Sequence, residues 1–294
     1  MDAIFNVLKP PQMTSHDVIG FLRRVLNTKK IGHGGTLDPD AAGVLPVFAG
    51  SATRLLEFAV EGRKEYIAEF TLGAQTVTGD DSGEVVKTMP VPAFGKQELE
   101  AVLAQFTGKQ MQLPPMYSAI KINGKKLYQL ARQGVEVERT ARPIEVYKLE
   151  LLHYTATSFT VRVACSKGTY IRVLLEEIAE AMGQKGTMSA LRRVAAGVYS
   201  EADAHTLEEI QAAKDAGPEA LQALMLPVES VFASLPLLVA DERVEQHLYN
   251  GCPTSRYPAA DGRYRVRNAG GQFLGLANVV NGVLKVEKLF VERN

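Results

Sequence analysis

The sequence predicts an α/β protein: a main domain of mixed helices and strands, followed by a small β domain. Segments with the two-residue period of strands alternate with segments of helical spacing as far as about residue 228. Beyond that point, short apolar stretches are separated by Gly and Pro turns, which is typical of a small β domain. A chain of 294 residues is also longer than most single small domains. We therefore place the two domains at 1–232 and 236–294.

The helices of the main domain are predicted from apolar spacing and from capping signals. The first has Thr14 or Ser15 available as its N-cap. The last follows Thr206, which forms a capping-box pattern with Glu209. The apolar positions that define the helices before this last one lie at 18–26, 99–106 and 171–182.

The strands of the main domain are predicted where apolar and polar residues alternate. A Gly- and Pro-rich loop is expected between the first helix and the first of these strands. The β domain has shorter strand-like stretches of its own. The expected strands are 65–72 and 159–165, then 264–266, 273–277 and 284–291, with the loop at 32–46 and a polar turn at 76–83.

Charge is balanced over the whole chain, with 33 basic and 33 acidic residues, but it is locally clustered. Residues 21–35 hold four Lys and Arg residues and no acid. Residues 105–145 hold seven basic residues against three acidic ones, a net charge of +4. Because nucleic-acid binding depends on local charge, the neutral total does not exclude an RNA partner.

Residues 110–145 read as an inserted element rather than as part of the core. Pro114-Pro115, Asn123-Gly124 and Gly134 interrupt them, and a short helix is possible at 127–132.

Several classes of protein are disfavoured by what the sequence lacks. Cys165 and Cys252 are far apart and do not suggest a secreted disulfide framework. No CxxC or HExxH motif predicts a zinc site. The N-terminus does not resemble a signal peptide, and no apolar run approaches the length of a membrane span. We expect a cytoplasmic protein without a metal or a membrane association.

The most informative segment for chemistry is the loop at 32–46. Its glycines allow another chain to approach the backbone closely. Pro39 restricts Asp38 to extended conformations and so helps to aim its carboxylate. A phosphate-binding loop is disfavoured because GxxxxGK[ST] is absent. The ordinary alternative is a tight turn in which Asp38 caps a helix.

The order of residues in this loop, His-x-Gly-Thr-Leu-Asp-Pro-x-Ala-x-Gly-Val-Leu-Pro, closely resembles the catalytic motif of the pseudouridine synthases that act on the T arm of transfer RNA. Further motifs resemble this bacterial tRNA pseudouridine synthase B family in the same order, and together they cover most of residues 1–230. These motifs are Lys64-Glu65-Tyr66, Leu72-Gly73 with Thr76 and Asp80, Pro114 to Ala119 with Lys121, Cys165 to Arg172, and Leu191-Arg192-Arg193.

The resemblance implies a fold, a reaction and a partner. The fold would be a mixed, largely antiparallel sheet flanked by helices, with the active cleft across its middle and a PUA-like C-terminal domain that binds RNA. The reaction would convert uridine 55 in the T loop of tRNA to pseudouridine, with no cofactor. The partner would be tRNA, with no obligatory protein partner, and the chain would be a monomer.

The resemblance also assigns catalytic roles. Asp38 would attack the anomeric carbon or remove a neighbouring sugar proton, and the residues do not choose between these routes. Arg172, near the start of a predicted helix, would hold that carboxylate ionised and oriented. Tyr66 would stack on the target uracil, although a lone Tyr is more often an ordinary core residue.

Substrate-binding roles are assigned to residues around this centre and in the insertion. Leu191 would pack on the other face of the base. His33 would occupy the place of the extruded nucleotide or hold the RNA, and Lys64 would contact phosphate or support Asp38. Tyr170 is also assigned to substrate binding. Residues expected to grip the RNA backbone are Lys121, Lys125, Lys126 and Arg132.

Two other functions remain open at this point. The chain could be an RNA-binding or RNA-folding protein without catalysis, a role that could also coexist with catalysis. It could instead be the catalytic subunit of a guide-RNA-dependent enzyme. We disfavour the latter because the chain begins almost at its first motif and ends at Asn294 without a basic tail.

Overall fold

The computed structural model describes residues 2–122 and 124–291. The chain divides into two compact units, Met1–Met225 and Leu226–Asn294, and each is described by itself. Residues 226–232, which the sequence analysis assigned to the first domain, group with the second unit. Phe232 packs beside Phe273 and Phe290 there, and Glu229 pairs with arginines of that unit.

A nine-stranded sheet forms the centre of the first unit within the described residues. Its order is β1-β3-β12-β4-β11-β10-β7, with β2 paired to β3 and β13 paired to β12. All of these pairs are antiparallel except the short parallel contact between β3 and β12. The strands are β1 (Ala3–Lys9), β2 (Ile31–His33), β3 (Ala42–Ala49), β4 (Lys64–Leu72), β7 (Gly108–Gln112), β10 (Arg142–Tyr154), β11 (Ser158–Cys165), β12 (Gly186–Ala196) and β13 (Tyr199–Ser200).

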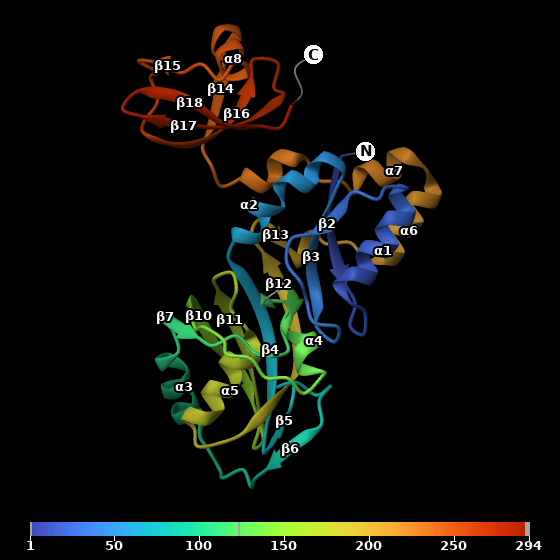
Figure 1. The fold of residues 1–294 in the computed structure, drawn as a ribbon, viewed down its shortest axis with the longest axis vertical. Coiled ribbons are helices and arrows are strands. Elements are labelled where there is room, and N and C mark those ends of the chain that lie inside the picture. The colour runs from blue at the N-terminus through green and yellow to red at the C-terminus, as the bar shows by residue number, and fades with distance from the viewer. Residues whose placement is uncertain (1, 123, 292–294) are drawn as a thin grey trace. The chain divides into compact units, whose positions relative to one another are not determined.

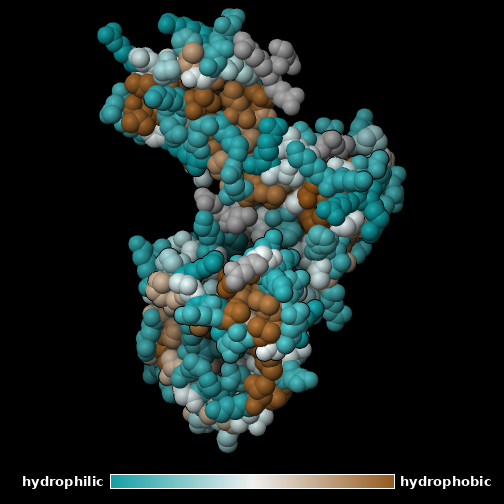
Figure 2. Space-filling model, in the orientation of Figure 1, coloured by the Kyte–Doolittle hydropathy of each residue, from teal (hydrophilic) through white to brown (hydrophobic). Residues whose placement is uncertain are grey.

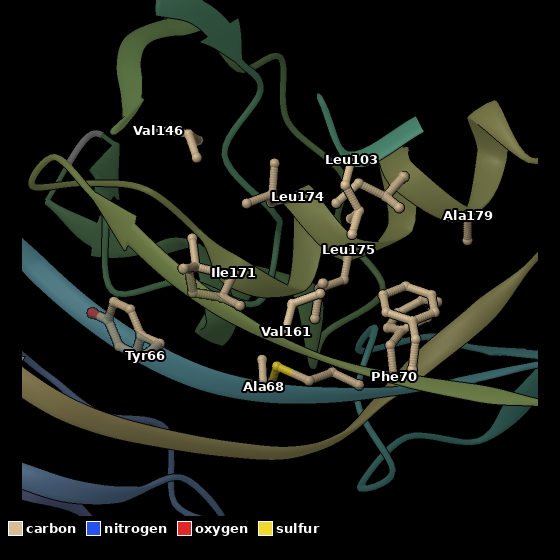
Figure 3. Close-up of a cluster of buried hydrophobic side chains, with 14 of the residues drawn as sticks. Tyr66, Ala68, Phe70, Leu103, Val146, Val161, Ile171, Leu174, Leu175 and Ala179 are labelled. Atoms are coloured by element: carbon tan, nitrogen blue, oxygen red, sulfur yellow. The ribbon is translucent and has the colours of Figure 1, made fainter. Parts of the chain in front are cut away.

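Helices pack at both ends of this sheet (Figure 1). One core cluster joins α1 and α6 to β1 and β3, and another joins α3 and α5 to β4 and β11. Figure 3 shows the second cluster, with residues of α5 against those of β4 and β11. The helices are α1 (Ser15–Leu26), α2 (Leu56–Glu61), α3 (Lys96–Gln105), α4 (Leu127–Ala131), α5 (Ile171–Ala181), α6 (Leu207–Ala216) and α7 (Pro218–Ala223), with 3₁₀ turns at η1 (Gly50–Leu55) and η2 (Glu201–Asp203).

The predicted fold class is confirmed, and so are the elements with strong periodicity. Thr14 caps α1 and forms a capping box with Asp17. Thr206 caps α6 in the same way with Glu209. The strands predicted at 65–72 and 159–165 are β4 and β11.

The loop expected at 32–46 is shorter than predicted, because β3 already begins at Ala42. Nearly all of β3 is buried, so its sequence lacks the alternation that marks a half-exposed strand. Gly43 and Pro46 also resemble strand-breaking residues. Gly43 has φ +109° and its Cα lies against the backbone of Arg193, where a Cβ would be 2.2 Å from the carbonyl oxygen.

The insertion contains regular structure. The short helix expected at 127–132 is confirmed as α4. It follows a two-stranded hairpin of β8 (Lys121–Ile122) and β9 (Lys125–Lys126). Asn123, expected in a turn, lies outside the described residues. Nearby, β5 (Ala74–Thr76) and β6 (Val85–Thr88) form another small hairpin around the polar turn.

As far as residue 291, the second unit consists of a five-stranded sheet in the order β14-β16-β17-β18-β15 and one α-helix, α8. The small β domain is therefore confirmed, while α8 was not expected from the sequence. Among the described residues, none of the helices combines the length and apolar content that crossing a bilayer needs. The elements are η3 (Val228–Phe232), β14 (Leu237–Ala240), α8 (Glu242–Tyr249), β15 (Thr254–Ser255), β16 (Gly262–Asn268), β17 (Phe273–Val280) and β18 (Val283–Leu289).

Candidate active site

The backbone on both sides of Asp38 is anchored to the ends of β1 and α1. The Ser15 hydroxyl accepts a hydrogen bond from the Leu37 N–H at 2.9 Å and lies 3.1 Å from the Leu37 carbonyl, to which it donates. The fully buried ammonium of Lys9 donates to the Pro39 carbonyl at 2.9 Å. Asp38 therefore sits between two fixed residues, which restricts the direction of its side chain.

Arg172, the second residue of α5, approaches Asp38 from the other side. Its Nε donates to Asp38 Oδ2 at 3.1 Å. Its two terminal nitrogens donate to the carbonyls of Thr78 at 2.6 Å and Tyr117 at 2.8 Å. The Arg172 side chain is only 6% exposed, whereas that of Asp38 is 40% exposed. A buried guanidinium that donates from all three of its nitrogens thus holds an accessible carboxylate.

A second carboxylate, Asp80, supports the same arginine. Asp80 Oδ2 lies 3.6 Å from Arg172 Nε. Asp80 Oδ1 accepts hydrogen bonds from the hydroxyls of Thr78 at 2.7 Å and Ser82 at 2.5 Å. These bonds fix the conformation of the polar turn. Arg172 is therefore held in position both by its place in α5 and by its contacts with this turn.

A cavity of about 440 Å³ opens beside Asp38. Its lining combines carboxylates with the apolar residues Met188 and Leu191. A flat, polar ring with an apolar face suits such a lining. The lining residues are Asp38, Asp40, Ala41, Asp80, Asp81, Ser82, Met188, Ser189, Ala190 and Leu191.

Arg193 ties the loop to the middle of the sheet. It is 1% exposed, and it donates to the carbonyls of Val44 at 2.7 Å and Gly35 at 3.0 Å. Arg193 also lies opposite Tyr66 in the β12–β4 register.

Tyr66 lies in the core cluster rather than in the lining of the cavity. Figure 3 shows it at the edge of the drawn cluster, with its hydroxyl directed away from the other labelled side chains. Burial raises the pKa of Tyr66, and the charge of Arg193 and a hydrogen bond from it act in the opposite direction. The phenol is therefore held neutral beside a buried cation.

His33 and Lys64 both lie near Arg193. Burial, and then the charge of Arg193, lower the pKa of His33. The His33 Nδ1 is buried without a hydrogen-bond partner in the described residues. Burial lowers the pKa of Lys64 to about 8, and its ammonium lies 3.3 Å from the Gly62 carbonyl.

Tyr170 stands immediately before α5 and is fixed through its backbone. Its N–H donates to Gln112 Oε1 at 2.8 Å, and its carbonyl accepts from Gln112 Nε2 at 3.1 Å. Burial raises the pKa of the Tyr170 hydroxyl.

The basic residues expected to grip RNA lie on the insertion, away from the lining of the cavity. Lys121, Lys125 and Arg132 are exposed and Lys126 is half-buried. Lys126 and Arg132 lie over the ring of Tyr128, at 5.7 Å and 5.6 Å from its centroid. The insertion contacts the Asp38–Arg172 pair through its backbone, because the Tyr117 carbonyl accepts a hydrogen bond from Arg172.

The contacts that Lys9, Ser15, Asp80 and Arg193 make around Asp38 were not predicted from the sequence. Lys9 and Arg193 are fully buried, and a charged residue type by itself predicts exposure. The only sequence signal was positional: Arg193 and Asp80 fell within matched motifs. No group of three or more His, Cys, Asp or Glu side chains in the part of the chain that the structure describes is arranged to hold a metal ion.

The overall fold matches that of chains in solved macromolecular complexes. A structure titled "Crystal Structure of a Cbf5-Nop10-Gar1 Complex" superposes with a TM-score of 0.75 at 25% identity, covering 99% of this chain and 85% of that chain. A substrate-bound H/ACA RNP structure superposes with the same TM-score at 24% identity, which shows the fold alone. A family model described as a pseudouridylate synthase matches half of the chain, which places the protein in the class of pseudouridine synthases.

The chain belongs to the TruB family. The model of the TruB family pseudouridylate synthase N-terminal domain matches residues 23–171, and that of the tRNA pseudouridylate synthase B C-terminal domain matches 172–233. The tRNA pseudouridine synthase B of Alkaliphilus oremlandii is 45% identical over 85% of this chain and 82% of its own length. That of Caldanaerobacter subterraneus subsp. tengcongensis is 41% identical over 99% of both chains.

Proposed function

We propose that this protein isomerises uridine 55 in the T loop of tRNA to pseudouridine, with Asp38 as the catalytic carboxylate. The observation that carries the proposal is the anchored loop, which presents Asp38 to the cavity while Arg172 bonds it at 3.1 Å. Membership of a family whose relatives are named tRNA pseudouridine synthase B supports the choice of RNA.

Asp38 begins the reaction in either of two ways. Its carboxylate attacks the anomeric carbon of the ribose, or it removes a neighbouring sugar proton. In both routes the bond from the anomeric carbon to uracil N1 breaks and the base departs with the bonding electrons. The base then turns and carbon five bonds to the anomeric carbon. In the first route this displaces the Asp38 carboxylate, and in the second Asp38 returns the proton to the sugar carbon. The hydrogen of carbon five leaves as a proton, and N1 regains a proton.

Different residues of the site can act at each step of this reaction. Arg172 keeps Asp38 oriented through the charge-assisted bond. Leu191 offers an apolar surface in the cavity to one face of the detached base. Tyr66 is proposed for the other face, and its neutral hydroxyl, which lies beside Arg193, can donate a hydrogen bond to the substrate. His33, Lys64 and Tyr170 are proposed to bind the RNA around this centre.

A uridine inside a folded RNA loop must leave its stack to reach Asp38. Unstacking has a cost, which contacts to the RNA backbone offset. We propose that Lys121, Lys125, Lys126 and Arg132 make such contacts, and that the PUA-like second unit adds more. We further propose that the chain acts as a monomer in the cytoplasm and needs no protein partner. A role in tRNA folding is compatible with this RNA-binding surface.

The test is release of tritium from tRNA labelled at carbon five of uridine, comparing the protein with Asp38→Asn. Pseudouridine formation must expel that hydrogen. We expect release by the parent protein and none by the variant, with RNA binding retained by both. Asp40→Asn serves as the matched control, because Asp40 lines the same cavity without contacting Arg172 in the structure described.

The other outcomes separate the rival functions. Tight binding without release by the parent protein would identify a non-catalytic RNA binder or an enzyme that needs a guide RNA. Equal release by the parent and by Asp38→Asn would refute the catalytic role of Asp38.

A further inference from the structure

A second basic surface lies outside the insertion, where α1 ends. Four cations, Arg23, Arg24, Lys29 and Lys30, are all exposed, and residues 21–35 contain no acid. We call these four side chains the α1 basic patch. None of the roles proposed above uses it.

The turn after α1 joins the two pairs of cations into one patch. Asn27 adopts the left-handed conformation with φ +46°, and its N–H bonds back to the Arg24 carbonyl at 3.4 Å. The next N–H, that of Thr28, bonds to the Arg23 carbonyl at 3.2 Å. The chain therefore folds back on the last turn of the helix, and the two lysines follow directly from this point.

The charge of the patch is not neutralised inside the protein. Within residues 2–122 and 124–291, none of its four cations takes part in an ion pair. The helix dipole favours Arg23 and Arg24 in the last turn of α1. It does not account for Lys29 and Lys30, which lie beyond the helix.

The patch is also rigid and close to the site. Val18, Leu22 and Val25 bury the opposite face of α1 in the core, and the Lys30 carbonyl accepts from the Gly50 N–H at 2.8 Å. His33 follows Lys30 by three residues of extended chain, so their Cα atoms are about 10 Å apart. Figure 2 shows a mainly hydrophilic surface over the region where Figure 1 places α1.

We infer that the α1 basic patch binds the phosphate backbone of the same RNA whose uridine enters the cavity. A rigid group of unpaired cations is suited to a polyanion, and releasing counterions from the RNA would drive the contact. The inference rests on the proposed function, since it takes the substrate to be RNA. The patch would contact the RNA phosphate backbone at a second place, separate from the contacts proposed for the insertion.

The test is the charge-reversing variant Arg23→Glu/Arg24→Glu in the full chain. The variant should bind tRNA at least about tenfold more weakly at roughly 0.1 M salt, because two contacts are lost and two repulsions are added. The slope of log Kd against log salt should fall by about one for each cation removed. Turnover at saturating tRNA should not change, because no patch residue touches the cavity.

Two further variants separate this effect from misfolding and from net charge. Lys29→Glu/Lys30→Glu lies beyond the helix and should reproduce the weaker binding without disturbing α1. Lys87→Glu/Lys96→Glu makes the same charge change at exposed residues of β6 and α3 and should bind like the parent. Thermal unfolding of each variant checks that it is folded.

Binding is measured in the Asp38→Asn background, so the result does not depend on catalysis. If both patch variants bind tRNA as the Lys87→Glu/Lys96→Glu control does, the inference is overturned. If the parent protein proves inactive while the patch variants alone lose RNA affinity, the proposed function fails and the RNA contact stands.

Discussion

Asp38 owes its position to two residues that never enter the cavity. Lys9 at the end of β1 bonds the Pro39 carbonyl, and Ser15 at the start of α1 bonds Leu37. The burial of Lys9 costs free energy, which its hydrogen bonds to three backbone carbonyls offset. The loop that carries Asp38 is therefore held in place by a strand and a helix, and not only by its own sequence.

The burial of Lys9 predicts a specific pH dependence of stability. Burial lowers its pKa from 10.5 to about 8, although Asp40 and Asp38 act in the opposite direction. Between pH 8 and 10.5 the unfolded chain keeps the proton that the folded chain has lost, so stability rises with pH in this window. Below about pH 8 both states carry the proton and the full cost of the buried charge remains.

Lys9→Met removes this titration. The unfolding free energy of the parent, measured relative to Lys9→Met, should therefore rise by up to about 3 kcal/mol from pH 8 to 10.5. Urea unfolding at several pH values measures the difference. Lys64, which titrates in the same window, is present in both proteins and cancels. A difference that stays constant with pH would show that Lys9 has an ordinary pKa.

At the scale of one element, the start of α1 stabilises the helix through one residue and positions the Asp38 loop through the next. Thr14 caps the helix, and Ser15 holds Leu37 beside Asp38. Thr14→Ala should lower the unfolding free energy by about 1 kcal/mol and leave turnover unchanged. Ser15→Ala should lower turnover by at least about tenfold, since small displacements of reacting groups are costly.

Single-turnover tritium release and urea unfolding of the two variants give both quantities. An equal loss of turnover in Thr14→Ala and Ser15→Ala would mean that α1 acts on the loop as a whole, not through the Ser15 hydroxyl.

The parallel contact of β3 with β12 depends on Gly43. A Cβ at this position would lie 2.2 Å from the Arg193 carbonyl, and φ is +109°. Gly43→Ala should cost about 3 kcal/mol or more in unfolding free energy. Gly20→Ala is the matched control, because nothing lies within 4 Å of its Cβ and it is inside α1. It should gain up to about 1 kcal/mol, and urea unfolding compares the two. Equal stability of the two variants would contradict the close approach.

The elements show where sequence reasoning succeeds. Strand β4 could be predicted because it is half-exposed, so apolar and polar residues alternate in its sequence. Helix α1 could be predicted because its apolar spacing and its capping residue mark its face and its start. Strand β3 shows no such alternation, because it is buried on both faces. The need for Gly43 is explained only by the backbone of Arg193, which is 150 residues away in the chain. The motifs named Asp38, Arg172 and Leu191, but only the fold brings Lys9 and Ser15 to the same loop.

The whole molecule combines a formal net charge of zero with local clusters of cations. Since RNA affinity depends on the clusters, a neutral protein can still bind a polyanion. The sequence reveals such clustering where the cations are neighbours in the chain. It does not reveal which cations are neutralised: in the second unit, Arg265 and Arg267 both pair with the buried Glu229.

RNA binding by the intact protein should depend steeply on salt. With Lys121, Lys125, Lys126 and Arg132 on phosphates, the slope of log Kd for tRNA against log salt should be about three or more, at roughly 0.7–0.9 for each contact. Filter binding with the Asp38→Asn variant measures it. Lys121→Gln/Lys125→Gln should reduce the slope by about two, whereas Lys87→Gln/Lys96→Gln should not. A shallow slope for the parent would mean that contacts to bases and sugars dominate binding, and the basic insertion would then be a solvated surface.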